Sequence, residues 1–268
     1  MKFKPLEILV TNDDGVAAKG INTVARYMRK WGNVTVVAPA SSQSGKSGSI
    51  SLSVPVYLNK LEEEDGFRIF SLTGSPVDCV KMGIRILRNE GKNADLLISG
   101  INHGSNTSAA SVYSGTLGAA TEGCLYDVPS IGLSLNTHDE NPDFSAALKY
   151  TDRILGKYFE NGLPRGTYLN VNIPAVPENE IKGVRIAHQG AGRWVREYEA
   201  EMEPDGKEHF VMKGMFEDME QTYTSGADMQ GDHRLLLDNY VSIVPHKIDT
   251  TNYEEALRLI ELWKCDTI

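Results

Sequence analysis

The sequence predicts an α/β protein with a mostly parallel sheet flanked by helices. Short apolar runs alternate along the chain with segments of helical periodicity, which is the pattern of parallel α/β folds. Residues 6–11 and 33–38 are two such runs, and the segment between them carries an apolar stripe at helical spacing. The stripe consists of Ile21, Val24, Ala25 and Met28. Together these elements form one strand–helix–strand unit, whose crossover should be right-handed.

Later segments continue the alternation. Residues 48–73 have the composition of extended structure around an acidic turn at 62–66. A helix is expected to begin at Ser75 and Pro76, because serine is a favourable N-cap and proline suits the first helical position. The remaining expected strands are 95–99, 129–135, 167–174, 182–189 and 239–249, and the remaining expected helices begin near Ser114 or cover 144–158 and 254–264.

One segment departs from this pattern. Between about residues 191 and 233 the chain is charged and turn-rich, and it lacks the valine and isoleucine of the earlier strands. We expect it to form a protruding hairpin or arm. The predicted organisation is therefore an α/β core over 1–190, an arm over 191–233, and a returning core strand with a closing helix over 234–268.

Bulk composition excludes several classes of protein. The net charge of −9 disfavours a nucleic-acid scaffold, because neutralising phosphates requires a basic face. No run of about 18 apolar residues occurs, so we expect no membrane span. The three cysteines, Cys79, Cys124 and Cys265, are too scattered for a disulfide framework or a zinc knuckle. This usage indicates a reducing, cytoplasmic compartment.

Three loops with small polar or acidic side chains follow predicted strands, at the edge where open α/β sheets bind ligands. They are 12–15 (NDDG), 41–47 (SSQSGKS) and 99–106 (SGINHGSN). Oxygen ligands of this kind suit Mg²⁺, Mn²⁺ or Ca²⁺ better than zinc. Neighbouring aspartates point to opposite faces of a strand, so Asp13 and Asp14 can share an ion only if the chain turns there, which Gly15 permits.

Other interpretations of the two aspartates stay open at this point. One can cap the following helix while the other is solvated. A pair of carboxylates acting as general acid and base is less favoured, because the second polar loop contains no partner carboxylate. A phospho-aspartyl nucleophile is also less favoured, because it usually comes with a second aspartate two residues away, whereas Asp13 and Asp14 are adjacent. A fourth feature, Ser114–Gly115–Thr116, opens a helix whose unpaired N–H groups suit phosphate, with a plain N-cap as the alternative.

Residues 40–47 also resemble a loosened phosphate-binding loop that ends in Gly45–Lys46–Ser47. Such a loop must open a helix, because its last residues aim the helix N-terminus at the phosphates. The residues after Ser47, GSISLSVPVYL, are β-branched, alternating and interrupted by Pro55. The surrounding sequence therefore argues against an ATP-binding loop.

Eight ordered blocks resemble the SurE family of survival-protein phosphatases over most of the chain, and the resemblance is weakest over about 191–231. The blocks are 8–15 (ILVTNDDG), 36–39 (VVAP) with its serine-rich loop, 73–80 (TGSPVDCV), 99–106 (SGINHGSN), 113–123 (YSGTLGAATEG), 128–135 (VPSIGLSL), 169–174 (LNVNIP) and 240–251 (YVSIVPHKIDTT). The resemblance implies a Rossmann-like core and a metal-dependent phosphatase acting on nucleoside 5′-monophosphates. Some members of the family also act on 3′-monophosphates and short polyphosphate.

The resemblance also implies a site. One divalent ion per subunit, Mg²⁺ or Mn²⁺ (with Ca²⁺ as a substitute in crystals), is expected on the ligands Asp13, Asp14, Ser44 and Asn102, of which the aspartates and Asn102 are the catalytic group. Ser44 is the fifth residue after the proline of VVAP, and Ala40–Gln43 replace the charged residues that the family often has between them. The expected phosphate and substrate residues are Asn12, Asn106, Ser114, Gly115 and Thr116.

Partners follow from the same resemblance. The expected ligand is a small nucleotide, and the arm and C-terminal segment are expected to exchange between subunits of a homodimer or homotetramer. Two alternatives to this function, both disfavoured, are a phosphate-loop NTPase or kinase acting through Lys46 and a non-catalytic nucleotide-binding regulator.

Overall fold

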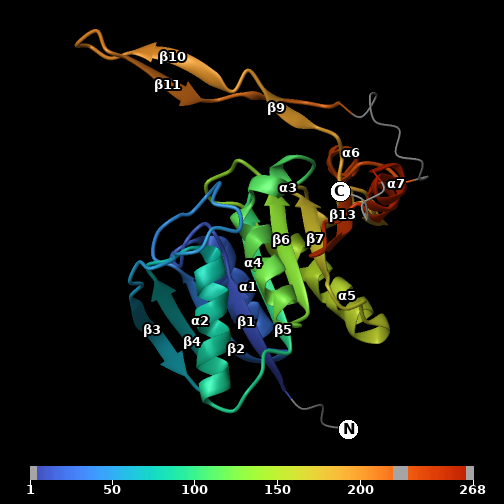
Figure 1. Ribbon diagram of the computed structural model, residues 1–268. Helices are drawn as coiled ribbons and strands as arrows, with labels where there is room; N and C mark the ends of the chain where they lie inside the picture. Colours follow the sequence, from blue (N-terminus) through green and yellow to red (C-terminus); the bar gives the residue numbers. More distant parts are fainter. Residues whose placement is uncertain (1–4, 220–228, 264–268) are drawn as a thin grey trace.

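A single nine-stranded sheet forms the centre of the molecule, as the computed structural model in Figure 1 shows. The structure describes residues 5–219 and 229–263. The strand order is β3-β4-β2-β1-β5-β6-β7-β13-β8, and the central strands from β4 to β7 run parallel. The strands are β1 (Leu6–Thr11), β2 (Gly32–Pro39), β3 (Leu58–Glu64), β4 (Phe67–Leu72), β5 (Leu96–His103), β6 (Ser130–Asn136), β7 (Thr167–Pro174), β8 (Gly183–Ile186) and β13 (Tyr240–Lys247).

Helices cover both faces of this sheet, so side chains alternate along each strand between two apolar cores. Ile8 and Val10 of β1 belong to the core under the helices α1 (Lys19–Met28) and α5 (Ser145–Asn161). Leu9 between them belongs to the core under α2 (Pro76–Asn89) on the other face. The described helices are α1 (Lys19–Met28), α2 (Pro76–Asn89), α3 (Ala110–Tyr113), α4 (Gly115–Leu125), α5 (Ser145–Asn161), α6 (Asp232–Leu237) and α7 (Tyr253–Trp263), with a 3₁₀ turn at Glu178–Glu180. The predicted α/β class is confirmed.

Helix α2, which was expected to begin at Ser75 and Pro76, begins there. Ser75 accepts a hydrogen bond from the N–H of Asp78, the Asp78 carboxylate accepts one from the N–H of Ser75, and Pro76 occupies the first helical position. This reciprocal capping box satisfies two N–H groups that the first turn would otherwise leave without partners. The N-terminus of α2 is therefore fixed locally by its own sequence.

Two of the expected elements differ in extent. Residues 49–57, expected to be extended, form an irregular loop, and the edge strand β3 starts only at Leu58. No helix follows Ser47, which agrees with the argument against a phosphate-binding loop. Strand β5 runs on to His103, past the expected end at Ser99, with an irregular register between Ser99 and Asn102. Asn102 is thus part of a strand rather than of the following loop.

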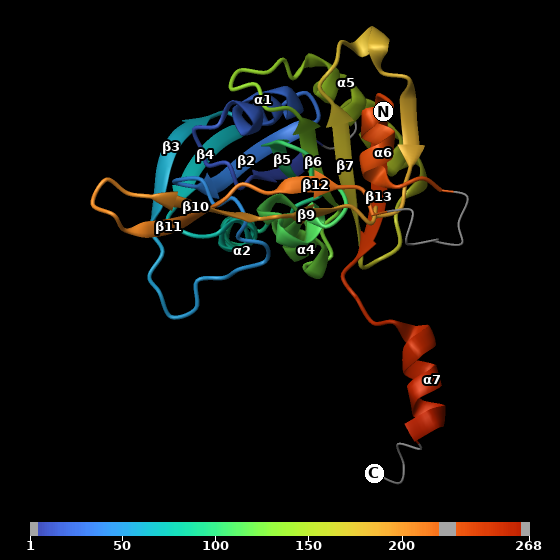
Figure 2. The same ribbon diagram turned by 90° about the horizontal axis from the view of Figure 1, so that it is seen from above.

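The arm consists of two short antiparallel ribbons, which Figure 1 shows extending beyond the carboxyl edge of the sheet. Its strands are β9 (Arg193–Val195), β10 (Tyr198–Met202), β11 (Glu208–Met212) and β12 (Met215–Glu217). Helix α7 also leaves the body of the molecule, as Figure 2 shows from above. The expected boundary at residue 233 falls inside α6, which the sequence pattern did not indicate.

Two smaller expectations, on the cysteines and on a membrane span, concern the described part of the chain. Cys79 and Cys124 are buried free thiols, and Cys265 lies outside the described residues. Within residues 5–219 and 229–263, no helix has both the length and the apolar character needed to cross a membrane.

Close packing of α1 on β5 makes Gly20 the first test of this fold. An added Cβ there would lie 2.1 Å from the carbonyl oxygen of Ile101, whereas one at Gly156 in α5 would meet nothing within 4 Å. We expect Gly20→Ala to lower the free energy of unfolding by about 1–3 kcal/mol. Gly156→Ala should raise it by about 0.5–1 kcal/mol through helix propensity. Equilibrium denaturation measures both, and equal effects would contradict the described packing.

Candidate active site at the carboxyl edge of the sheet

The loops that follow β1 and β2 pack directly against each other at the carboxyl edge. The N–H of Gln43 donates to the carbonyl of Asp13 over 2.7 Å. Gly15 has a φ of +100°, and a Cβ there would lie 3.3 Å from the backbone of Ser41 and Ser42. The NDDG segment therefore turns sharply at this point, as the shared-ion interpretation of Asp13 and Asp14 requires.

Asp13 is buried against the N-terminus of α4. It is 5% exposed, and its Oδ1 accepts a hydrogen bond of 2.6 Å from the hydroxyl of Thr116. Burial raises the pKa of the Asp13 carboxyl above its ordinary value, although the Thr116 hydroxyl and the N–H groups of Thr116 and Gly115 oppose this rise. A Cβ on Gly115 would lie 2.8 Å from the Cβ of Asp13, so only glycine permits this approach.

Asp14 is partly buried on the other side of the turn. Its Oδ2 accepts a hydrogen bond of 3.1 Å from the N–H of His103, at the end of β5. Burial, followed by the charge of Asp13, raises the pKa of Asp14 to about 6. The ring of His103 instead pairs with the carbonyl of Asp139.

Asn102 has a fixed amide, whereas the hydroxyl of Ser44 is exposed. The Asn102 side chain is buried, and its Nδ2 donates to the carbonyl of Gly104 over 2.7 Å, which leaves the amide oxygen as its acceptor. The Ser44 hydroxyl lies 3.1 Å from that of Ser42. The structure places the backbone of Ser44 next to Gln43 and hence beside Asp13, but no hydrogen bond joins its hydroxyl to either described aspartate.

These donors fit a hard divalent cation. Two neighbouring carboxylates that burial makes costly to ionise gain from a positive charge between them, and oxygen ligands select magnesium- or manganese-like ions. In the part of the chain that the structure describes, no three His, Cys, Asp or Glu side chains come together to hold an ion. A cation at Asp13 and Asp14 would therefore need neutral oxygen ligands as well.

Three of the expected substrate residues make structural hydrogen bonds. Asn12 is fully buried, and its Nδ2 donates to the carbonyl of Gly15 over 3.0 Å, which closes the turn. Ser114 caps α4 by accepting from the N–H of Leu117 over 3.1 Å. Thr116 uses its hydroxyl on Asp13. The N-terminus of α4 thus acts on the carboxylate of Asp13 directly.

Asn106 is held by a polar network that the sequence analysis missed. Its N–H donates to Asn172 Oδ1 over 2.7 Å, its Nδ2 donates to the hydroxyl of Ser134 over 2.9 Å, and its carbonyl accepts from Asn170. The side chain of Asn172 in turn donates to Asn170. The available signal was the pair Asn170 and Asn172, two residues apart in an otherwise apolar strand and hence on one face.

A second missed group lies behind this network. The carboxylate of Asp232 is fully buried and accepts hydrogen bonds from the N–H groups of Ser108, Gly190 and His233, over 3.1, 3.0 and 2.8 Å. The Ser108 hydroxyl lies 2.9 Å from Nδ1 of His233. Asp232 therefore ties the loop that carries Asn106 to the base of the arm. No pattern in the single sequence indicated this contact.

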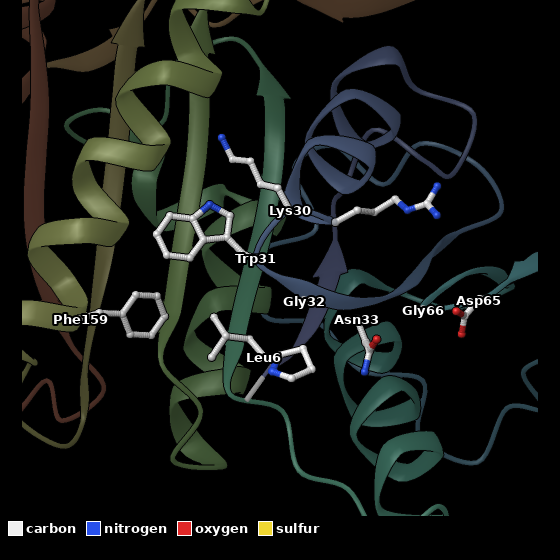
Figure 3. A pocket seen from close by; sticks show the side chains of 10 residues that line it. Leu6, Lys30, Trp31, Gly32, Asn33, Asp65, Gly66 and Phe159 are labelled. Atoms are coloured by element: carbon white, nitrogen blue, oxygen red, sulfur yellow. The ribbon is translucent and has the colours of Figure 1, made fainter. Parts of the chain in front are cut away.

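Another cavity lies away from these residues, at the amino ends of β1 and β2. It has a volume of about 850 Å³ and is lined by residues that include Trp31 and Phe159 (Figure 3). Its cations are already paired, Arg29 with Glu64 and Lys30 with Asp152. We place the site at the carboxyl edge because the carboxylates with raised pKa and the free amide oxygen lie there.

Comparisons with known proteins show the family of the chain. A family model described as survival protein SurE matches residues 8–196. A protein of Phocaeicola vulgatus named 5′-nucleotidase SurE is 42% identical over 252 residues, which are 94% of each chain. One of the same name from Thermosipho africanus is 40% identical over 98% of this chain and 100% of its own. The crystal structure of SurE protein from Aquifex aeolicus has a TM-score of 0.78 and 33% identity, and covers 96% of this chain and 99% of its own.

The raised pKa of Asp14 predicts a pH-dependent effect of added cation. Without metal, a carboxyl whose pKa is raised by folding stabilises the protein at low pH, and this contribution is lost as the pH rises through about 6. A bound cation should offset that loss. We therefore expect Mn²⁺ to raise the melting temperature by about 5 °C or more at about pH 8, and by less at about pH 5. Differential scanning fluorimetry with and without chelator measures this difference.

Asp14→Asn provides the matched control, because the amide has no charge to relieve. The variant should lose most of the Mn²⁺ effect at both pH values. A Mn²⁺ effect of the same size at both pH values in the unaltered protein would contradict the assignment of the aspartates as ligands.

Proposed function

The chain belongs to the SurE family of survival proteins, and we propose that it is a divalent-metal-dependent phosphatase that hydrolyses nucleoside 5′-monophosphates to nucleoside and phosphate. The observation that carries the proposal is the pair Asp13 and Asp14, two adjacent carboxylates with raised pKa values at the carboxyl edge of a parallel sheet. Relatives that are 40% and 42% identical carry the name 5′-nucleotidase, which supports the same substrate class.

The proposed ligands of one Mg²⁺ or Mn²⁺ ion are the carboxylates of Asp13 and Asp14, the amide oxygen of Asn102 and the hydroxyl of Ser44. When bound, such an ion polarises the phosphoryl group and lowers the pKa of a bound water. The two carboxylates would balance the charge of a dication, and the two neutral ligands add no further negative charge, so the ion could still accept a phosphate oxygen as a ligand.

The remaining residues orient these ligands and the phosphate. Thr116 and the first N–H groups of α4 hold Asp13, while the N–H of His103 holds Asp14. Asn106 gives one of its two amide hydrogens to Ser134, so the second can be donated to a phosphate oxygen. The partial positive charge at the N-terminus of α4, near Ser114 and Gly115, stabilises the same negative charge.

We also propose that the chain works as a homo-oligomer that its C-terminal helix helps to assemble. Helix α7 buries no residue, and an apolar stripe at helical spacing, Tyr253, Leu257 and Ile260, is 57–68% exposed. The arm likewise exposes Tyr198, Phe210 and Met212. A homodimer or homotetramer in which these segments pack on another subunit would cover both surfaces. The buried free thiols Cys79 and Cys124 support a reducing, cytoplasmic location.

Replacing Asp13 tests the proposed chemistry. With Mg²⁺ or Mn²⁺, we expect phosphate release from a panel of nucleoside 5′-monophosphates that chelator abolishes. Asp13→Asn should lower kcat/KM by about a hundredfold or more, because metal stabilisation of the transition state contributes several kcal/mol. Asp127→Asn, at a surface aspartate paired with Arg165, is the matched control and should keep its activity. Unchanged activity in Asp13→Asn would overturn the ligand assignment.

Charging the apolar stripe of α7 tests the assembly. The double substitution Leu257→Glu and Ile260→Glu should shift the mass measured by light scattering after size exclusion towards that of a single chain. Glu261→Gln, on the same helix, should leave the mass unchanged. A double variant with the unaltered protein's mass would show that α7 does not hold the oligomer together.

A further inference from the structure

A second cavity adjoins the proposed phosphate site at the carboxyl edge. It has a volume of about 350 Å³ and lies between the loop after β2, the segment 49–51 and the start of α2. Gln43, Lys46, Ile50 and Leu72 are among the residues that line it. Pockets of this size are at the lower end of the range that small-molecule ligands occupy.

The loop after β2 connects this cavity to the two aspartates. Gln43 lines the cavity, and its backbone N–H donates to the carbonyl of Asp13. In the sheet, β4 neighbours β2 and β2 neighbours β1. Because neighbouring strands are about 4.8 Å apart, a cavity above the ends of β2 and β4 lies about 5–10 Å along the edge from the end of β1. A nucleoside attached to a phosphate at Asp13 and Asp14 would extend into such a position.

The walls of the cavity are held by hydrogen bonds that leave their polar groups satisfied. The Ser75 hydroxyl donates to the carbonyl of Ser49 over 2.6 Å. The carboxylate of Asp78 accepts from the N–H and hydroxyl of Ser51 and from the N–H of Ser75, and these bonds outweigh burial and lower its pKa. These hydrogen bonds fix the segment 49–51 to the N-terminus of α2. One wall of the cavity is therefore held in place.

Other groups that line the cavity have capacity to bind a ligand. No described carboxylate forms an ion pair with the exposed ammonium of Lys46. The amide nitrogen of Gln43 donates to the carbonyl of Ser42 over 3.1 Å, which leaves its amide oxygen as an acceptor. Ile50, which is 44% exposed, gives the cavity accessible apolar surface, whereas Leu72 is fully buried and offers none.

We propose that this cavity is the nucleoside subsite of the proposed phosphatase, an inference that rests on the proposed function. The base lies against Ile50, and Lys46 and Gln43 hydrogen-bond to the polar atoms of the ribose and base. Lys46, which the phosphate-loop pattern would have placed on ATP phosphates, acts here on the part of the substrate that carries no phosphate.

Kinetics with two substrates test this subsite. Adenosine 5′-monophosphate has the ribose and base, whereas p-nitrophenyl phosphate has neither. Lys46→Ala should raise the KM for the nucleotide about tenfold, because a hydrogen bond to a charged donor is lost. Its kcat/KM for p-nitrophenyl phosphate should change by less than about twofold. Ala40→Phe, which fills the cavity from another lining position, should show the same selectivity, and Lys157→Ala on α5 should alter neither substrate.

Adenosine alone gives a readout without a phosphate. It should inhibit p-nitrophenyl phosphate hydrolysis competitively, and more weakly in Lys46→Ala and Ala40→Phe. Variants that affect both substrates equally, or neither, would overturn the subsite. An unaltered protein that releases phosphate from neither substrate with Mg²⁺ or Mn²⁺ would instead overturn the proposed function, and the subsite with it.

Discussion

The cost of burying two adjacent carboxylates, Asp13 and Asp14, is the constraint on which the carboxyl edge of this sheet depends. Burial raises the pKa of both groups, and the charge of Asp13 raises that of Asp14 further. The fold offsets part of the cost by placing Thr116 and the N-terminus of α4 on one carboxylate and the N–H of His103 on the other. These contacts do not neutralise two charges. The proposed divalent cation would neutralise both.

The backbone around the pair follows from the same requirement. The chain must turn at Gly15 to bring both carboxylates to one place, and α4 must approach closely enough that Gly115 can have no side chain. The loop after β2 is tied to the turn through Gln43, so whatever this loop binds lies next to the proposed phosphate site. In the proposed site, phosphate chemistry and nucleoside recognition therefore share one edge of the sheet, with Asp13 serving the first and Lys46 the second.

Periodicity and capping were enough to predict the fold class and most elements, because parallel strands covered on both faces are strongly apolar and α2 carries its own capping box. The error at 49–57 has a physical reason: alternating residues also suit a loop whose hydrogen bonds go to α2 rather than to a strand. Motifs indicated the aspartates and Asn102, yet the support of Asn106 by Asn172 and the role of Asp232 depend on contacts across 66 and 124 residues. Local patterns do not encode such distant pairings.

The position of a bound metal tests this account most directly. Crystals of the unaltered protein grown with Mn²⁺ and measured at the manganese absorption edge would locate the ion by its anomalous scattering. The account predicts one peak per chain within coordination distance of Asp13, Asp14, Asn102 and the hydroxyl of Ser44, which would have to turn from Ser42. Crystals with no peak beside the two aspartates, or with the only peak elsewhere on the chain, would contradict it.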